Sequence, residues 1–417
     1  MQSASALRRV ETDTWLPLRA SVPVRHSSAP GKAAVHVAIL VYDLRASGVV
    51  RNALRIARAA AAAGLAAELW VVRSTGAFAQ DTGGIPVRVI ANGRPRLSRA
   101  VDSIVTLPAL AATIRRLRPA VLLSAGNHMH AFACAAHRFS GTSETQLIGR
   151  ASNALAAATP PKRTGPAARL IRRSAAALER AQFSMMDRVI AVSHELGDDL
   201  QRHGVSPARL AVIPNGVDVD AIGRAAEAPI DHPWFADDVP PVVIAVGRLS
   251  PQKDFATLIR AFAAARQVRP MRLVILGDGP AAERARLTAL AGTLGVGGDL
   301  WLGGYQANPH AFVARAALSV LSSRWEGASN VLIEALACGT PVVATACPTG
   351  VREVLTEPCG SLVPVGDDAA MARAMLARLS MPRGTAACRA RAADFSLRTM
   401  MDGYAEYLHA AVLERAQ

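Results

Sequence analysis

Two carboxylates and a helix start share the segment from Ser322 to Gly339 of this 417-residue chain. We expect an apolar strand to end near Ser322, a loop to run to the N-cap residue Ser329, and a short helix to stop at Gly339. The free N–H groups of the loop and first helical turn would form an anion site. Glu326 on the loop and Glu334 in the helix could accept hydrogen bonds from sugar or ribose hydroxyls beside that anion. The alternative is one solvated loop glutamate and one exposed helix glutamate.

A second pair of charged residues follows another apolar strand, expected at residues 242–246. Arg248 and Lys253 lie on the glycine-containing turn after this strand. Because Arg presents a planar fork of donors and Lys a compact point charge, the two together can hold a diphosphate. Two solvated loop charges are the competing interpretation.

A glycine-rich turn follows the next strand, expected at residues 273–276. Gly277, Gly279 and Ala282 match the relaxed dinucleotide pattern G-x-G-x-x-A, and Asp299 lies at a plausible distance for a ribose-binding acid. A nicotinamide-dependent enzyme is therefore an alternative on local grounds. However, that pattern belongs on the first strand–helix turn of its domain, and here the first turn carries Arg248. We favour a turn that lets a ligand approach, with a purely structural turn as the alternative.

Two further patterns resemble metal sites. Asp218 and Asp220 have the D-x-D spacing of metal-binding transferases, but they follow a Pro-Asn-Gly turn at the edge of a linker, where we expect them to start a helix. His128 and His130 alternate without a nearby third ligand. The sequence therefore predicts no metal site.

Apolar strand-like runs alternate with amphipathic helical patterns, which predicts two doubly wound α/β domains with parallel sheets. The expected strands cover residues 35–42, 67–72, 121–124, 188–192 and 210–213, then 242–246, 273–276, 300–302, 318–321 and 342–345. We expect one domain over residues 33–215, a second over 216–395, and a helix over 396–417 that packs back towards the first. Ligands bind such sheets at the carboxyl ends of the strands, so the natural site is the cleft between the domains.

Basic residues are concentrated in the first half of the chain. Residues 1–220 hold 28 Lys/Arg against 14 Asp/Glu, whereas residues 221–417 hold 19 against 18. The asymmetry indicates an anionic partner, or only a compositional bias towards Arg. We expect peripheral contact with an anionic membrane, because basic residues accompany two helical stretches and apolar residues accompany the second of them. No nucleic-acid partner is expected. The basic residues are Arg94, Arg96, Arg99, Arg115, Arg116 and Arg118 in one stretch, and Lys162, Arg163, Arg169, Arg172, Arg173 and Arg180 in the other.

Composition also predicts the cellular location of the protein and the character of its N-terminal segment. Residues 1–32 mix Ser, Pro and Arg without periodicity, which predicts a disordered basic tail. The chain lacks a run of apolar residues long enough to predict a transmembrane helix. Its five cysteines include no C-x-x-C pair, which fits a reducing compartment. We therefore expect a cytoplasmic protein, with peripheral contact at the inner face of the cell membrane.

Several motifs of this chain resemble those of the retaining family-4 glycosyltransferases of the GT-B fold and occur in the same order as in that family. The resemblance covers nearly all of residues 35–395. Glu326 and Glu334 reproduce the family pattern of Glu, seven residues, Glu. The resemblance implies two Rossmann-like domains that face a deep interdomain cleft. It also implies transfer of a sugar, with retention and without a metal, from a nucleotide diphosphate sugar (UDP being common) to a glycan or lipid-linked acceptor of cell-surface polysaccharide or lipopolysaccharide. The nucleotide sugar is then a substrate, and no cofactor is expected.

The resemblance further implies roles for individual residues. Arg248 and Lys253 would hold the donor diphosphate, Glu334 the ribose hydroxyls, and Glu326 the donor sugar during catalysis. His128 matches the place of a family residue near the reacting sugar. The remaining donor-binding residues would be Gly279, Tyr305, Gly327, Ala328, Ser329, Asn330 and Val331.

On the acceptor side, the resemblance implies roles for Gly48 and Arg51. They lie where the family has a glycine-rich loop, although this chain has only one glycine there.

Two other functions fit the same resemblance. A different GT-B-like enzyme, such as a nucleotide-sugar epimerase, should show its own catalytic acids or a cofactor lysine, which the sequence does not identify. A noncatalytic nucleotide-sugar-binding partner would be expected to lose Arg248, Lys253, Glu326 or Glu334, and all four are present.

Overall fold

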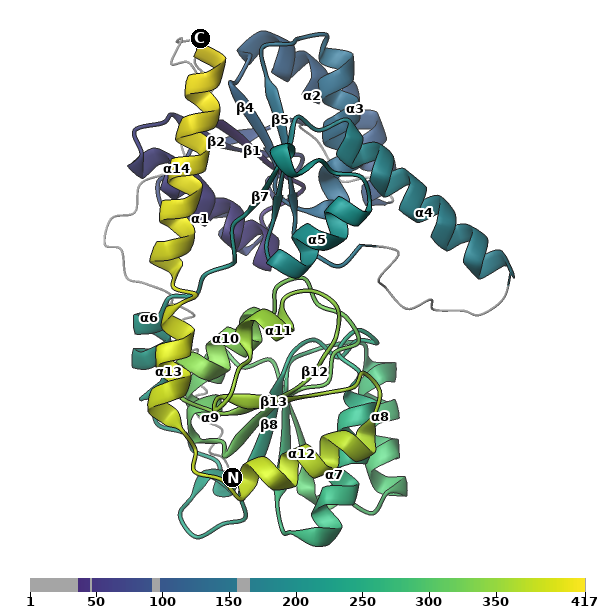
Figure 1. Cartoon of the computed structure of the whole chain (residues 1–417), viewed down its shortest axis with the longest axis vertical. Coiled ribbons are helices and arrows are strands. Elements are labelled where there is room, and N and C mark those ends of the chain that lie inside the picture. Colours follow the sequence, from purple (N-terminus) through teal and green to yellow (C-terminus); the bar gives the residue numbers. More distant parts are fainter. Residues whose placement is uncertain (1–36, 46, 92–97, 156–165, 417) are drawn as a thin grey trace, which may run out of the picture.

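A computed structural model describes residues 37–45, 47–91, 98–155 and 166–416 (Figure 1). The first half of the chain forms a parallel sheet of strand order β3-β2-β1-β4-β5-β6-β7. These strands are β1 Val37–Val41, β2 Ala67–Val71, β3 Val87–Val89, β4 Val121–Ser124, β5 Gln146–Ala151, β6 Arg188–Ala191 and β7 Leu210–Val212. Its helices are α1 Gly48–Ala62, α2 Arg99–Leu117, α3 His130–Ser140, α4 Pro166–Ser184 and α5 His194–Arg202.

The second half forms another parallel sheet, of strand order β10-β9-β8-β11-β12-β13. Its strands are β8 Val242–Val246, β9 Arg272–Leu276, β10 Leu300–Gly304, β11 Leu318–Leu321, β12 Val342–Thr345 and β13 Gly360–Val363. The helices that accompany it are α6 Val219–Ala226, α7 Phe255–Val268, α8 Ala281–Thr293, α9 Pro309–Arg315, α10 Asn330–Ala337, α11 Val351–Val354, α12 Asp368–Leu379 and α13 Thr385–Ala393. The predicted class, two doubly wound parallel-sheet domains, is confirmed.

Each sheet has apolar layers on both faces, which is why its strands read as continuous apolar runs. In the first domain, one core packs α1 against the sheet and the other packs α2, α3 and α5. In the second domain, one core packs α7, α8 and α12, and the other packs α6, α9, α10, α11 and α13. All strand pairs are parallel, so the carboxyl ends of β8 to β12 meet at one edge.

The chain crosses from one domain to the other twice, and the two crossings lie side by side. Val217 and Ser396 form a parallel bridge, in which the N–H of Val217 donates to the carbonyl of Phe395 at 3.0 Å and the N–H of Leu397 donates back to Val217 at 2.7 Å. From there α14, Leu397–Ala416, returns along α1 of the first domain (Figure 1). The C-terminal helix therefore contributes to the first domain's core, through Met400, Tyr404 and Leu408.

The sequence analysis missed three strands, β3, β5 and β13. The predicted tail over residues 1–32 lies outside the described residues, as do Arg94, Arg96, Lys162 and Arg163 and the side chains of Arg169 and Arg172.

Candidate functional site

Glycine turns pack together at the carboxyl edge of the second sheet. Gly277, which follows β9, has φ +136°, and a Cβ there would collide with the carbonyl of Gly247, which follows β8. A Cβ on Gly279 would meet Leu249. The N–H of Leu249 donates to the carbonyl of Asp278 at 2.9 Å. These glycines therefore bring two strand–helix turns into contact, which is a close-packing role for the G-x-G pattern.

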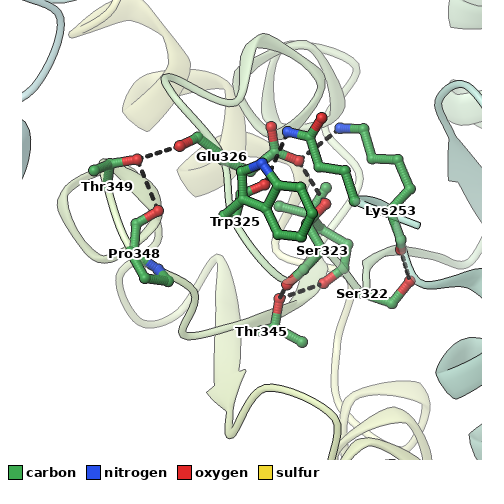
Figure 2. Close-up of polar contacts among 10 residues, drawn as sticks. Lys253, Ser322, Ser323, Trp325, Glu326, Thr345, Pro348 and Thr349 are labelled. Carbon is green, nitrogen blue, oxygen red and sulfur yellow. Dashed lines mark hydrogen bonds and ion pairs between the residues drawn. The ribbon is translucent and has the colours of Figure 1, made fainter. Parts of the chain in front are cut away.

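Lys253 and Glu326 form an ion pair at this edge, with 2.6 Å between Nζ and Oε1 (Figure 2). Their side chains are only 15% and 8% exposed. The hydroxyl of Ser323 donates to the same Oε1 at 2.5 Å. The structure thus joins the cation proposed for the diphosphate to the carboxylate proposed for the donor sugar, although 73 residues separate them in sequence.

The loop that carries Glu326 is fixed by side-chain hydrogen bonds (Figure 2). The hydroxyl of Ser322 donates to the carbonyl of Lys253 at 2.7 Å, and the hydroxyl of Thr345 donates to that of Ser323 at 2.5 Å. The hydroxyl of Thr349 donates to the carbonyl of Glu326. Since β8, β11 and β12 each contribute a following segment to this network, the carboxylate has a defined position before any ligand binds.

The next residue, Gly327, lies directly against the first domain. A Cβ at this position would collide with the backbone of Ser152 and Asn153, which follow β5. The N–H of Ala154 donates to the carbonyl of Glu326 at 3.2 Å. The predicted donor loop is therefore part of the contact between the two domains.

The N-terminus of α10 differs from the expectation in one respect. Ser329 occupies the N-cap position, but its hydroxyl makes no capping hydrogen bond; it is buried and unpaired among the described residues. Asn330, the first helical residue, instead accepts a hydrogen bond at 3.0 Å from the amide of Asn215 in the interdomain crossing. The N–H groups of Asn330 and Leu332 donate to the carbonyls of Ala328 and Ser329, so the hydroxyl of Ser329 is a group at this helix start that a ligand could use.

Glu334 is on the same helix and is 21% exposed. Its carboxylate lies 3.7 Å from Nε2 of His310, a buried residue of α9. Burial raises the pKa of Glu334, but the nearby His310 and the charges of Arg51 and Arg55 outweigh burial and hold the pKa below its ordinary value. Glu334 is therefore ionised at neutral pH and can accept hydrogen bonds from hydroxyl groups.

Other residues predicted to bind the donor lie at the same carboxyl edge of the second sheet. Arg248 is exposed, and the described residues offer its side chain no hydrogen bond or ion pair. Tyr305, after β10, is 71% exposed, and its N–H donates to Asp278 at 3.2 Å. Both are free to contact a ligand. Ala328 and Val331 are half-buried on either side of the α10 start.

The acceptor-side residues lie at the carboxyl edge of the first sheet. Gly48 begins α1 after the N-cap Ser47, and a Cβ on Gly48 would meet nothing within 4 Å, so no close approach requires this glycine. Arg51 lies one turn into α1 and acts electrostatically on Glu334 of the other domain. His128 follows β4 and is exposed. Partial desolvation lowers the pKa of its ring, while the charge of Asp43 acts to raise that pKa.

The positions of Asp299 and Asp218 argue against two alternative interpretations of the sequence, a dinucleotide site and a D-x-D metal motif. Asp299 precedes β10, at the amino edge of the sheet, where it bonds Arg266 at 2.9 Å and Arg272 at 2.5 Å. It cannot serve as the ribose acid of a dinucleotide site at the opposite edge. Asp218 caps α6 through Oδ1, which accepts from the N–H of Ala221 at 2.9 Å, as expected for a helix start. Within the described part of the chain, no cluster of three or more His, Cys, Asp or Glu could hold a metal ion.

Sequence reasoning missed His310, Arg55, Ser323 and Asn215 at this site. His310 carries no local motif, and Arg55 is a helical arginine whose guanidinium donates to the carbonyl of Gly216 at 3.0 Å across the interdomain crossing. Burial and the charge of Arg51 lower the pKa of Arg55 to about 10. Arg55 and Asn215 make contacts across domains, which leave no periodic signal in the sequence, so only the Pro-Asn-Gly turn could have pointed to Asn215.

The fold and this site define a class of protein. Residues 46–221 match the family described as Glycosyltransferase Family 4, and residues 240–381 match the family described as Glycosyl transferases group 1. The two matches together cover most of the chain, which therefore belongs to these glycosyltransferase families; the glycosyltransferase family predicted from the sequence is confirmed, and retention stays a prediction.

Characterised relatives resemble part of the chain. An N-acetylgalactosamine-N,N'-diacetylbacillosaminyl-diphospho-undecaprenol 4-alpha-N-acetylgalactosaminyltransferase from Campylobacter jejuni is 34% identical over 42% of this chain and 46% of the relative. The lipopolysaccharide core biosynthesis glycosyltransferase LpsE from Rhizobium meliloti is 35% identical over 40% of this chain and 46% of the relative. The chain thus spans slightly less than half the length of these curated relatives.

Solved structures resemble the whole architecture. Anabaena Alr3699/HepE, in a crystal structure with UDP and glucose, superposes with a TM-score of 0.73 at 19% identity, over 90% of this chain and 99% of the other. At this identity the likeness establishes the fold, and the two-domain arrangement is that of GT-B glycosyltransferases.

Proposed function

We propose that this protein is a retaining glycosyltransferase that moves a sugar from a nucleotide diphosphate sugar to a glycan or lipid-linked acceptor of cell-surface polysaccharide. The observation that supports it most is the Lys253–Glu326 pair, because Glu326 precedes α10, the helix that begins after the unpaired hydroxyl of Ser329 and carries the ionised Glu334. Cation, helix N-terminus and carboxylates are the groups that a diphosphate with two attached sugars requires.

The leaving group in this reaction is a nucleoside diphosphate, and the developing charge on it must be stabilised. Arg248, Lys253 and the N-terminus of α10 supply positive charge and N–H donors at one edge of the sheet. They are positioned before the reaction, so they can stabilise the transition state without a metal ion. Glu326, held by Ser323 and Lys253, would face the donor sugar from this fixed position.

The donor is proposed to be a UDP-sugar. The relative Alr3699/HepE was crystallised with UDP and with glucose. The exposed Tyr305 follows β10 at the edge where the turns of Gly277 and Gly279 pack, which is a suitable place for the base.

The acceptor is proposed to be anionic, because cations collect where it would bind. At the carboxyl end of β1, the buried carboxylate of Asp43 holds Arg45 at 2.6 Å and Arg99 at 3.3 Å. These guanidiniums remain 57% and 52% exposed. Since each gives Asp43 only part of its donor set, both can also bind a phosphate. The Campylobacter jejuni relative is named for a diphospho-undecaprenol substrate.

A thermal-shift screen against UDP-, GDP- and ADP-sugars tests the donor proposal. We expect stabilisation of the wild type by one of them, and a reduced shift for Glu334→Ala. Glu144→Ala, in the segment before β5 of the first domain, is the matched control and should keep the shift. No shift with any nucleotide sugar, in wild type and Glu334→Ala alike, would remove the basis of the assignment.

We also propose peripheral contact with the inner face of the cell membrane through α4. This helix extends away from the rest of the first domain (Figure 1) and exposes Leu170, Ile171 and Leu178 by 66%, 70% and 58% beside Arg173 and Arg180. Apolar and basic residues on one exposed helix suit an anionic bilayer. Among the helices that the structure describes, none has the length and apolar character to cross a bilayer.

Flotation with anionic liposomes at low salt tests this contact. The wild type should float, whereas Leu170→Glu/Ile171→Glu should stay in the soluble fraction. Val268→Glu, equally exposed on α7 of the second domain, is the control and should float. A wild type that remains soluble would refute the membrane proposal without affecting the donor site.

A further inference from the structure

A cavity of about 530 Å³ lies on the second domain, at the far end of α10 from the proposed phosphate site. Its walls come from α6, the last residues of α10 and the segment that includes α13. This size is within the range of small-molecule sites, about 300–1,000 Å³. None of the residues assigned to donor or acceptor lines it.

Three guanidiniums line this cavity, those of Arg224, Arg383 and Arg389. Arg383 is held in place by hydrogen bonds from Nη2 to the carbonyl of Ala314 and, at 3.0 Å, to the hydroxyl of Thr340. Its Nε is buried and has no partner among the described residues. The side chains of Arg224 and Arg389 likewise have no hydrogen-bond or ion-pair partner in the described part of the chain. Cationic donors thus face the cavity unused.

Arg383 forms no ion pair in the described part of the chain. Burial lowers the pKa of Arg383, the thiols of Cys388 and Cys338 oppose that change, and the charge of Arg389 adds to it. The two acids of the lining, Asp220 and Glu227, belong to α6 together with Arg224 and are exposed. Arg383 and Arg389 are therefore a pair of neighbouring cations without an acid of their own.

We propose that this cavity binds a small metabolite with a phosphate monoester, held by Arg383 and Arg389, and that its binding changes the donor affinity. A phosphate monoester carries nearly two negative charges at neutral pH, which matches two guanidiniums, and its oxygens suit their forked donors. Arg224, Asp220 and Glu227 would contact the polar body of the ligand.

The coupling would pass through α10. Cys338 and Ala337, at the end of this helix, line the cavity, Glu334 is one turn away, and Asn330 at its start bonds Asn215 of the interdomain crossing. A ligand that shifts the end of an eight-residue helix also shifts its start. This part of the inference rests on the proposed donor site.

Calorimetric titration of the full chain with phenyl phosphate tests the site. The wild type should bind it, and Arg389→Gln should weaken the affinity about tenfold, because a charged hydrogen-bonded contact is lost. The donor-site variant Arg248→Gln/Lys253→Gln and the surface control Arg286→Gln, on α8 at the other face of the sheet, should bind as the wild type does. Benzyl alcohol, which lacks the phosphate, should not bind.

Several outcomes would overturn the proposal. They are no binding by the wild type, equal binding by Arg389→Gln, or loss of binding in the donor-site variant alone, which would place the phosphate at the donor site. Since Arg389 is exposed and unpartnered, Arg389→Gln should unfold at the wild-type temperature, so a failure to fold would not be mistaken for loss of the site.

The coupling has its own readout, the affinity for UDP with and without saturating phenyl phosphate. By linkage, each ligand must change the affinity of the other by the same factor, and Arg389→Gln should abolish this effect. An unchanged UDP affinity would refute the coupling. If phenyl phosphate binds and UDP does not, the proposed function fails while the cavity site stands.

Discussion

At the scale of single residues, the Lys253–Glu326 ion pair gives a prediction for stability and one for the proposed donor binding. Lys253→Met would leave the carboxylate of Glu326 largely buried without its cation. We expect a loss of roughly 2–3 kcal/mol in the free energy of unfolding, since an unpaired buried charge is costly. Denaturant titration measures this loss.

The double variant Lys253→Met/Glu326→Gln is the control for that prediction. It removes both charges, so most of the stability should return, while nucleotide-sugar binding should stay impaired because the phosphate cation is absent. If the double variant is as unstable as Lys253→Met, the pair is not what stabilises the loop.

The lowered pKa of Glu334 gives a pH-dependent prediction. Because its folded-state pKa is depressed, ionised Glu334 contributes stability above the unfolded-state value, and this contribution is lost as the pH falls through the folded-state pKa. In His310→Gln, burial would dominate and the pKa should rise above its ordinary value. Carboxyl-carbon NMR titration of Glu334 measures both midpoints. A midpoint unchanged by His310→Gln would show that His310 does not hold this carboxylate.

At the scale of elements, the sequence predicts most strands of both sheets because strands buried on both faces are continuous apolar runs. Strand β5 escapes this rule, since it contains Gln146 and Arg150. Arg150 is nonetheless only 1% exposed, because its guanidinium bonds Tyr404 at 2.8 Å and Asn215 at 2.5 Å. These partners are 254 and 65 residues away, so no local pattern could reveal them.

In the candidate site, too, some features could be predicted from the sequence and others only from the structure. Motifs located Arg248, Lys253, Glu326 and Glu334 because each follows a strand or starts a helix that the sequence reveals. Their partners also come from other elements: His310 of α9 lies beside Glu334, and Lys253, after β8, pairs with Glu326, after β11. Which cation faces which carboxylate is a property of packing between elements, and it had to come from the structure.

The start of α6 distinguishes a helix cap from a metal ligand. Asp218→Asn should keep both stability and activity, since Asn caps a helix about as well as Asp, whereas Asp218→Ala should cost about 1 kcal/mol. Thermal unfolding and donor-sugar hydrolysis, with and without EDTA, measure this. A loss of activity in Asp218→Asn that added Mn²⁺ restores would instead identify a metal ligand.

At the scale of the whole molecule, two glutamates join the domains by reciprocal helix contacts. Glu353 of α11 accepts hydrogen bonds from the N–H groups of His194 and Glu195 at the start of α5, at 2.9 and 2.5 Å. Glu195 accepts one from the N–H of Gly350, just before α11, at 2.9 Å. Each domain therefore supplies a carboxylate to a helix start of the other, which favours the arrangement in which Gly327 meets Ser152.

This reciprocal contact predicts how one substitution changes the relative position of the domains. Glu353→Ala removes both hydrogen bonds to α5. A loss of about 2 kcal/mol of interdomain contact free energy would shift the equilibrium roughly 30-fold towards an arrangement in which the domains are further apart. Small-angle X-ray scattering should then give a larger radius of gyration than for the wild type. Glu144→Ala, whose partner Arg118 lies in the same domain, should leave it unchanged. Equal radii for wild type and Glu353→Ala would mean that the domains are held by other contacts, such as those of Asn215 with Asn330 and of α14 with α1.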